Sequence, residues 1–221
     1  ADMAKYATKA QYRYLQILFD RAPESVGLRF KYSFIDPEAK SRDLQTALDQ
    51  LTWSGLLNPI LATSAGGVPL QSQVKVKVQK LLYLDIGMLQ TALRVDPLSF
   101  FRDDLTLIHA GALAEQFVGQ ELIAYANPHD RMQLYFWERE KVGSDAEVDY
   151  VLPLGPHPIS LEVKAGSTGK LRSLQVFLKE KKSPFGIRVC GSKPEKKESL
   201  ITLPFYLVSQ LKRLSGVESF D

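Results

Sequence analysis

Apolar residues recur at helical spacing in the first part of the chain. They crowd residues 12–19, and the stretch KSRDLQTALDQLTWSGLL has the i, i+3, i+4, i+7 spacing of an amphipathic helix that ends at Gly55. The core positions of that helix are Leu44, Ala47, Leu48 and Leu51. LNPILATSAGGVPLQSQVKVKVQKLLYL then has β-rich ends around a Gly-Gly turn, with period-two alternation in VKVKV. Helices followed by a hairpin predict a winged-helix-like unit over residues 1–96.

A break at Pro97 separates a second unit, residues 97–221. Its pattern predicts a helix at 104–126, strands at 133–137, 147–152 and 159–163, a helix at 170–181 and a strand at GIRVC. This order indicates an α/β or α+β sheet covered by helices. A repeat array or an all-β sandwich would not combine helices and strands in this order. KPEKKES predicts a charged loop, and LPFYLVSQLKRL predicts a last helix.

Composition narrows the chemistry more than it narrows the fold. The 221 residues are 45% hydrophobic and 24% charged, and a net charge of +3 permits contact with an anionic polymer without demanding it. The lone Cys190 excludes an intrachain disulfide framework and a cysteine zinc site, and it predicts a reducing cytoplasm. Three widely spaced histidines leave carboxylates as the expected ligands of any metal. Charges interrupt the apolar runs, so no membrane anchor is expected.

The stretch AEVDYVLPLGPHPISLEVKAG concentrates the candidate chemistry. Folding its two strands about a Gly-Pro turn sets Asp149 opposite Glu162, with Lys164 on the same face as Glu162. Two adjacent carboxylates repel unless a cation joins them, and their oxygens suit Mg²⁺ or Mn²⁺. The lysine would orient or help deprotonate an attacking water, or stabilise the charge that develops on a phosphoryl group. The plain alternative is the solvated alternation of an exposed strand.

Glu115 is a carboxylate on the core side of its predicted helix. Its arc contains Ile108, Gly111, Val118 and Leu122. A carboxylate on an apolar face is costly unless it is paired or bound to metal, and the charges of the sheet are candidate partners. The alternative is a structural ion pair with Lys164 or with an arginine.

Together these positions resemble the PD-(D/E)xK nuclease superfamily, whose core runs helix, three strands, helix, strand. Glu115, Asp149, Glu162 and Lys164 match its motif, while Val148 replaces the superfamily's proline. The resemblance implies a restriction-endonuclease-like α-β-β-β-α-β core. It further implies that these four residues are catalytic and that Asp149 and Glu162 hold Mg or Mn.

Four motifs in order, LLYLDIGMLQ, GALAEQFVGQEL, AEVDYVL and ISLEVKAG, resemble the C-terminal region of bacterial and archaeal P-loop ATPases, the domain-of-unknown-function 4143 family. FKYSFIDPEAKSRDLQTALDQLTWSGLL is similar to that family's winged-helix segment. The resemblance implies that an ATPase module precedes this region and that the chain is the C-terminal part of a larger protein. DNA is the partner that we expect for the nuclease-like unit.

KAGSTGKLRS is not a Walker motif, because Lys164 and Leu171 occupy its glycine and Ser/Thr positions, so no nucleotide site is expected in this chain. Ser167 or Thr168 is predicted to cap the next helix, and the free N–H groups, with Ser167 and Lys170, to hold a backbone phosphate. A plain capped helix is the alternative. Lys40, Arg42 and Gln45 would suit a DNA groove, and a solvated helix face explains them equally.

Three functions remain open at this point. The first is a metal-dependent nuclease, the second is a non-catalytic module that binds nucleic acid or protein, and the third is a regulatory domain of the ATPase.

Overall fold

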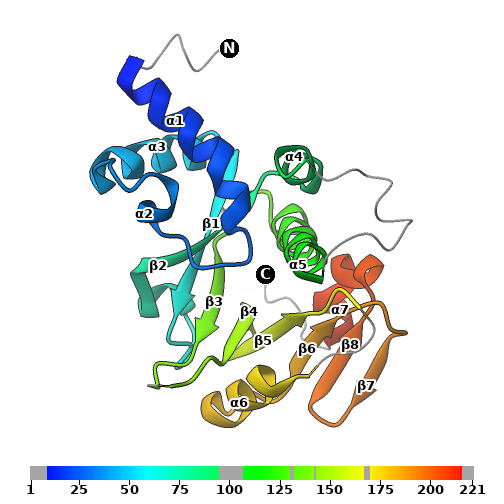
Figure 1. Ribbon diagram of the computed structural model, residues 1–221. Coiled ribbons are helices and arrows are strands. Elements are labelled where there is room, and N and C mark those ends of the chain that lie inside the picture. The colour runs from blue at the N-terminus through cyan, green and yellow to red at the C-terminus, as the bar shows by residue number, and fades with distance from the viewer. Residues whose placement is uncertain (1–8, 95–106, 130–131, 142, 167–169, 216–221) are drawn as a thin grey trace.

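A mixed sheet of eight strands runs through the computed structural model, which describes residues 9–94, 107–129, 132–141, 143–166 and 170–215 (Figure 1). The strand order is β2-β1-β3-β4-β5-β6-β8-β7. The strands are β1 (Leu57–Thr63), β2 (Val74–Tyr83), β3 (Leu134–Glu138), β4 (Glu147–Leu154), β5 (His157–Val163), β6 (Gly186–Val189), β7 (Glu195–Lys197) and β8 (Leu200–Leu203). The predicted α+β class is confirmed.

Helices precede, interrupt and follow these strands. The α-helices are α1 (Lys9–Arg21), α2 (Tyr32–Ile35), α3 (Ser41–Trp53), α4 (Ile86–Ala92), α5 (Leu107–Ala124), α6 (Arg172–Lys181) and α7 (Leu211–Ser215). Short 3-10 turns are η2 (Ala22–Ser25), η3 (Leu70–Gln73) and η5 (Phe205–Gln210).

Helix α3 forms where the apolar periodicity predicts it. Its four predicted core residues are all buried, and they join α1 in a cluster that also takes in Leu57 and Tyr83. Each fully buried leucine of this kind contributes about 1.5–3 kcal/mol. Gly55 has φ +75, the left-handed conformation that glycine supplies after a helix end.

The β1–β2 hairpin, predicted as the wing of a winged helix, belongs to the large sheet. Its strands pair antiparallel, and β1 also pairs in parallel with β3, with Ile60 beside Leu134. The register steps from Leu61↔Gln79 to Ala62↔Lys75, so β2 carries a bulge of three extra residues there. The sheet therefore crosses the predicted boundary at residues 96–97, which itself lies in the undescribed stretch 95–106.

The second half follows the predicted order of helix, three strands, helix and strand, as α5-β3-β4-β5-α6-β6. Two predictions are wrong. The expected loop KPEKKES contains β7, whose three residues are all exposed and whose backbone pairs with β8. Strand formation here comes from the ladder and not from side-chain pattern, and charges of this kind protect a sheet edge.

The predicted last helix is also different, since it is divided into η5 and α7. Val208 and Leu211, three residues apart, are both 4% exposed. The tighter 3-10 winding places residues three apart on one side, which lets both side chains pack on the sheet.

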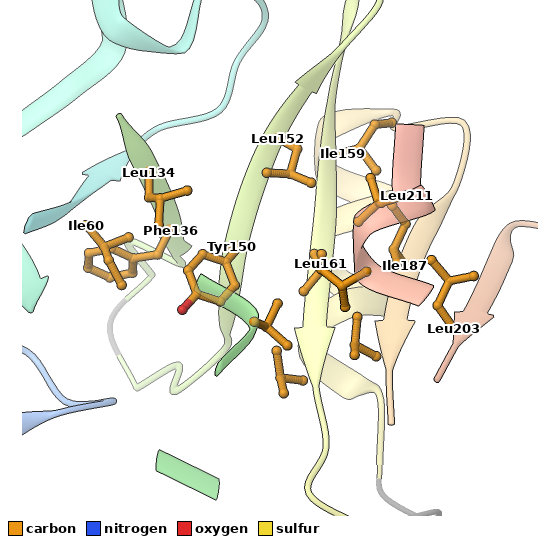
Figure 2. Close-up of a cluster of buried hydrophobic side chains, with 14 of the residues drawn as sticks. Ile60, Leu134, Phe136, Tyr150, Leu152, Ile159, Leu161, Ile187, Leu203 and Leu211 are labelled. Carbon is orange, nitrogen blue, oxygen red and sulfur yellow. The ribbon is translucent and has the colours of Figure 1, made fainter. Parts of the chain in front are cut away.

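Helices cover both faces of the sheet. Tyr150 and Leu152 belong to a cluster with Val118 of α5, whereas Val151, between them on β4, packs with Leu174 of α6. Alternate residues of a strand point to opposite faces, so α5 and α6 lie on opposite sides of the sheet (Figure 1). Figure 2 shows the α5-side cluster running across neighbouring strands.

Candidate functional site

The β4–β5 hairpin brings the predicted sheet carboxylates together. Its register pairs Tyr150 with Leu161, so one residue further on Asp149 lies opposite Glu162, as the Gly-Pro turn predicts. The backbone N–H of Val163 donates to Asp149 Oδ2 at 2.7 Å. This contact holds the carboxylate where β4 begins and β5 ends.

Glu162 and Lys164 form an ion pair at the end of β5. Lys164 Nζ donates to Glu162 Oε1 at 2.6 Å. Glu162 is 5% exposed, and its Oε2 is buried without a hydrogen-bond partner. The lysine side chain is 29% exposed, so one end of the pair reaches solvent.

Helix α5 positions Glu115 over these strands. The side chain of the neighbouring Gln116 accepts a hydrogen bond from the Tyr83 N–H and donates one to the Tyr83 carbonyl, at 2.9 and 2.8 Å. The Tyr150 hydroxyl donates to the Glu115 carbonyl at 2.8 Å. Gly119 permits this approach, because a Cβ there would collide with Leu82 and with the Tyr150 hydroxyl.

Lys80 of β2 is a central residue that the sequence analysis missed. It is 1% exposed, its Nζ lies 3.9 Å from Glu115 Oε2, and it forms an ion pair with Glu147. Its ammonium also lies 5.1 Å from the Phe136 ring centroid. A signal was present, since Lys80 shares the period-two face of β2 with the apolar Val78 and Leu82.

We call this group the acidic cluster. Its members are Glu115, Glu147, Asp149 and Glu162, with Lys80 and Lys164. All four predicted catalytic residues lie in it. Four carboxylates and two ammonium groups leave a net charge of −2 when every group is ionised.

Burial and mutual repulsion disfavour full ionisation of these carboxylates. Burial, with the charge of Asp149, raises the pKa of Glu115 to about 8 and that of Glu162 to about 7. Burial also raises the pKa of Asp149, against the opposing effects of Lys80 and of the Val163 N–H. Burial alone would lower the pKa of Lys80, but Glu115 and Glu147 raise it above its ordinary value.

The donor set of the cluster fits a hard divalent cation. Carboxylate oxygens are the ligands that Mg²⁺ and Mn²⁺ prefer, and Glu162 Oε2 is a buried oxygen that lacks a partner. Within the described ranges, however, no three carboxylate, thiol or imidazole side chains converge as a ready metal site. The two ammonium groups lie among the carboxylates instead.

The predicted phosphate-binding position receives less support. Helix α6 begins at Arg172 with Leu171 as its N-cap, a residue whose side chain makes no capping hydrogen bond. Leu171 packs against the α6-side core. Ser167 and Thr168 lie outside the described residues, and Lys170 is exposed.

The polar positions of α3 are no better distinguished from a solvated surface. Lys40 is the N-cap of α3, and the Arg42 side chain is 85% exposed, with its Nε 3.8 Å from Asp43. Gln45 is also exposed.

An apolar cavity of about 230 Å³ lies away from the acidic cluster. It is lined by Leu152–Leu154 at the far end of β4, by Tyr125 and by Leu211, among others. The charged chemistry and this hollow therefore occupy opposite ends of one strand.

Comparison with known families matches the two halves of the chain separately. Residues 110–206 match a domain of unknown function, DUF4143, and residues 1–99 match a second one, DUF8612. The first match contains the four predicted catalytic residues, whereas Lys80 lies in the second. The N-terminal segment thus matches a model of its own and not the DUF4143 model that it was expected to extend.

Comparison with curated proteins and with solved structures found no match. None of the helices in the described part of the chain has the length and hydropathy that a membrane crossing requires.

Proposed function

We propose that this chain carries a PD-(D/E)xK-type nuclease unit that hydrolyses phosphodiester bonds of DNA with Mg²⁺ or Mn²⁺. The observation that carries the proposal is the convergence of Glu115, Asp149, Glu162 and Lys164, from one helix and two strands, at one end of the sheet. The element order around them, α5-β3-β4-β5-α6-β6, is the order that the resemblance implies.

Each charged side chain has a role in this proposal. Asp149 and Glu162 would hold the metal ion, which when bound supplies Lewis-acid stabilisation of the phosphoryl oxygens. Lys164, partly exposed and already donating to Glu162, orients the attacking water and faces the charge that develops in the transition state. Glu115 assists from the helix, where its carboxyl group lies near Asp149 and 3.9 Å from the Lys80 ammonium group.

The first test is incubation of the chain with labelled single-stranded, duplex and branched DNA in Mn²⁺. We expect cleavage that falls by about 100-fold or more in Asp149→Asn and in Lys164→Ala. Asp145→Asn and Lys141→Ala are matched controls, since both residues are exposed on the loop before β4, and they should cleave as the wild type does. Undiminished cleavage by Asp149→Asn would refute the assignment.

A second candidate is a non-catalytic module that grips DNA or a protein partner. One observation favours it: the ammonium groups of Lys80 and Lys164 already pair with cluster carboxylates, so much of the charge is balanced by the protein itself. This candidate predicts DNA binding that weakens with salt, ignores Mn²⁺ and survives Lys164→Ala.

We also propose that the unit serves a P-loop ATPase, on the strength of the motifs that resemble the C-terminal region of such proteins. Addition of the chain to that ATPase module should alter its ATP turnover. An unchanged turnover, together with DNA binding at physiological salt, would argue against a regulatory role.

A further inference from the structure

We infer that the Lys80 side chain stands in for a second divalent cation at the candidate site, so that removing it opens a position for one additional Mn²⁺. The inference rests on the proposed metal-dependent function. It assigns to the N-terminal half of the chain a residue of a site whose other members come from the segment that matches DUF4143.

The Lys80 ammonium group is held among carboxylates. Lys80 Nζ lies between a carboxylate of α5 and a carboxylate of β4, at 3.9 Å from Glu115 Oε2 and in an ion pair with Glu147. The ring of Phe136 lies 5.1 Å away, so the cation has oxygen and π partners and almost no solvent. A bound cation would take up the same kind of place between carboxylates.

Burial of the Lys80 ammonium group costs free energy. An ammonium group buried to 1% exposure loses its hydration, and the loss is tolerated only where negative groups surround it. An apolar side chain would suit the neighbours Val78, Leu82 and Phe136 better. The carboxylates of Glu115 and Glu147 supply the negative groups that make a lysine tolerable at this position.

The carboxylates around Lys80 lie next to the predicted metal ligands. Glu147 forms an ion pair with Lys80, and Asp149 lies close enough to Glu115 to disfavour its ionisation. The pair Glu115 and Glu147 is therefore next to the pair Asp149 and Glu162. Sites with two metal ions place the ions about 3.5–4 Å apart between shared carboxylates. Lys80 occupies one side of such an arrangement and leaves the other side, with the unpartnered Glu162 Oε2, for an ion.

The backbone around Gly27 covers the acidic cluster beside Glu115. Gly27 has φ +78, and a Cβ built on it would lie 3.3 Å from Glu115 Oε2. Two residues on from Leu28, the Phe30 N–H donates to the Gln79 carbonyl at 2.8 Å, so this segment runs along β2 beside Lys80. The N-terminal half thus supplies both the internal cation and the backbone that covers Glu115.

The test is to count Mn²⁺ ions bound per chain by isothermal titration calorimetry, with free Mn²⁺ measured by electron paramagnetic resonance. We expect Lys80→Ala to bind one more Mn²⁺ than the wild type, and the double variant Lys80→Ala/Glu115→Gln to lose that extra ion. Lys77→Ala is the matched control, because Lys77 is an exposed lysine of the same strand, and its count should equal the wild-type count.

The two proposals fail separately in this experiment. The wild-type count reports on the metal site of Asp149 and Glu162, and a count of zero would refute that site. The difference between Lys80→Ala and wild type reports on Lys80 alone, and equal counts would overturn the inference whatever the wild-type value.

A second variant and a second measurement test the inference if Lys80→Ala does not fold without metal. Lys80→Met keeps a linear side chain of similar volume against Phe136 and removes only the charge. Both Lys80 variants should gain more thermal stability from Mn²⁺ than the wild type gains. A gain no larger than that of the wild type would also overturn the inference.

Discussion

The two ends of strand β4 solve opposite physical problems. At the C-terminal end Leu152 and Leu154 are buried in an apolar cluster that needs only shape and volume from its neighbours. At the N-terminal end Glu147 and Asp149 need counter-charges, which come from Lys80 of β2 and from Lys164, directly after β5. A charged end of this kind is costly to build, so its presence within a well-packed sheet points to function rather than to stability.

Removing the internal cation should break the charged end most severely. Lys80→Met removes the ammonium group that pairs with Glu147 and lies 3.9 Å from Glu115, and loss of one partner of a buried ion pair costs up to about 3–5 kcal/mol. The free energy of unfolding in urea at pH 7 without divalent metal measures this loss. Lys77→Met, at an exposed position of the same strand, should leave it unchanged. An equal effect of the two variants would show that Lys80 is not a buried counter-ion.

Truncation at the apolar end should cost slightly less and should not depend on charge. Ile159 is fully buried on β5 opposite Leu152, and Ile159→Ala should destabilise the protein by about 2–5 kcal/mol through lost burial and a residual cavity. The same urea experiment, repeated at pH 5 and pH 8.5, should give the same difference from wild type at both values. A strongly pH-dependent difference would mean that the two ends are coupled.

The pH dependence of stability should come from the charged end. The pKa of Glu115 is raised from 4.5 to about 8 in the folded state, so the folded protein holds a proton that the unfolded chain releases. The stabilisation from this proton is complete below about pH 4.5 and is lost as the pH rises to about 8. In metal-free protein the contribution of this group therefore makes the urea midpoint fall between pH 5 and pH 8.5.

Glu115→Gln tests the origin of that slope. The amide carries no titrating proton, so the variant should lose much of the decline between pH 5 and pH 8.5. Equal slopes in the wild type and in Glu115→Gln would assign the pH dependence to another group.

The smallest effect is expected at the surface. Glu140 pairs with Lys75, but its side chain is 71% exposed, and solvent screens pairs of this kind. Glu140→Gln should leave the urea midpoint unchanged within error. A clear loss of stability would show that exposed ion pairs near β2 and β3 contribute measurably to the free energy of unfolding.

Much of the local structure was predictable from residue patterns. The apolar spacing of α3, the Gly-Pro turn between β4 and β5 and the resulting pairing of Asp149 with Glu162 all follow from interactions within about 20 residues. The core-side position of Glu115 followed from helical periodicity, because a carboxylate on an apolar face requires a partner. Strand β7 was missed, because its side chains carry no strand signal.

By itself, the sequence determined most of the elements, their order and the four charged positions, since periods of 2 and 3.6 residues and turn chemistry act over short separations. Only the tertiary structure decided that β1 would lie beside β3, that the hairpin would join the sheet and that Lys80 would enter the acidic cluster. The contacts of Lys80 with Glu115 and of β1 with β3 join residues 35 and 74 positions apart, respectively. Pairing over such distances depends on how whole faces of helices and strands bury one another, which no short stretch of sequence records.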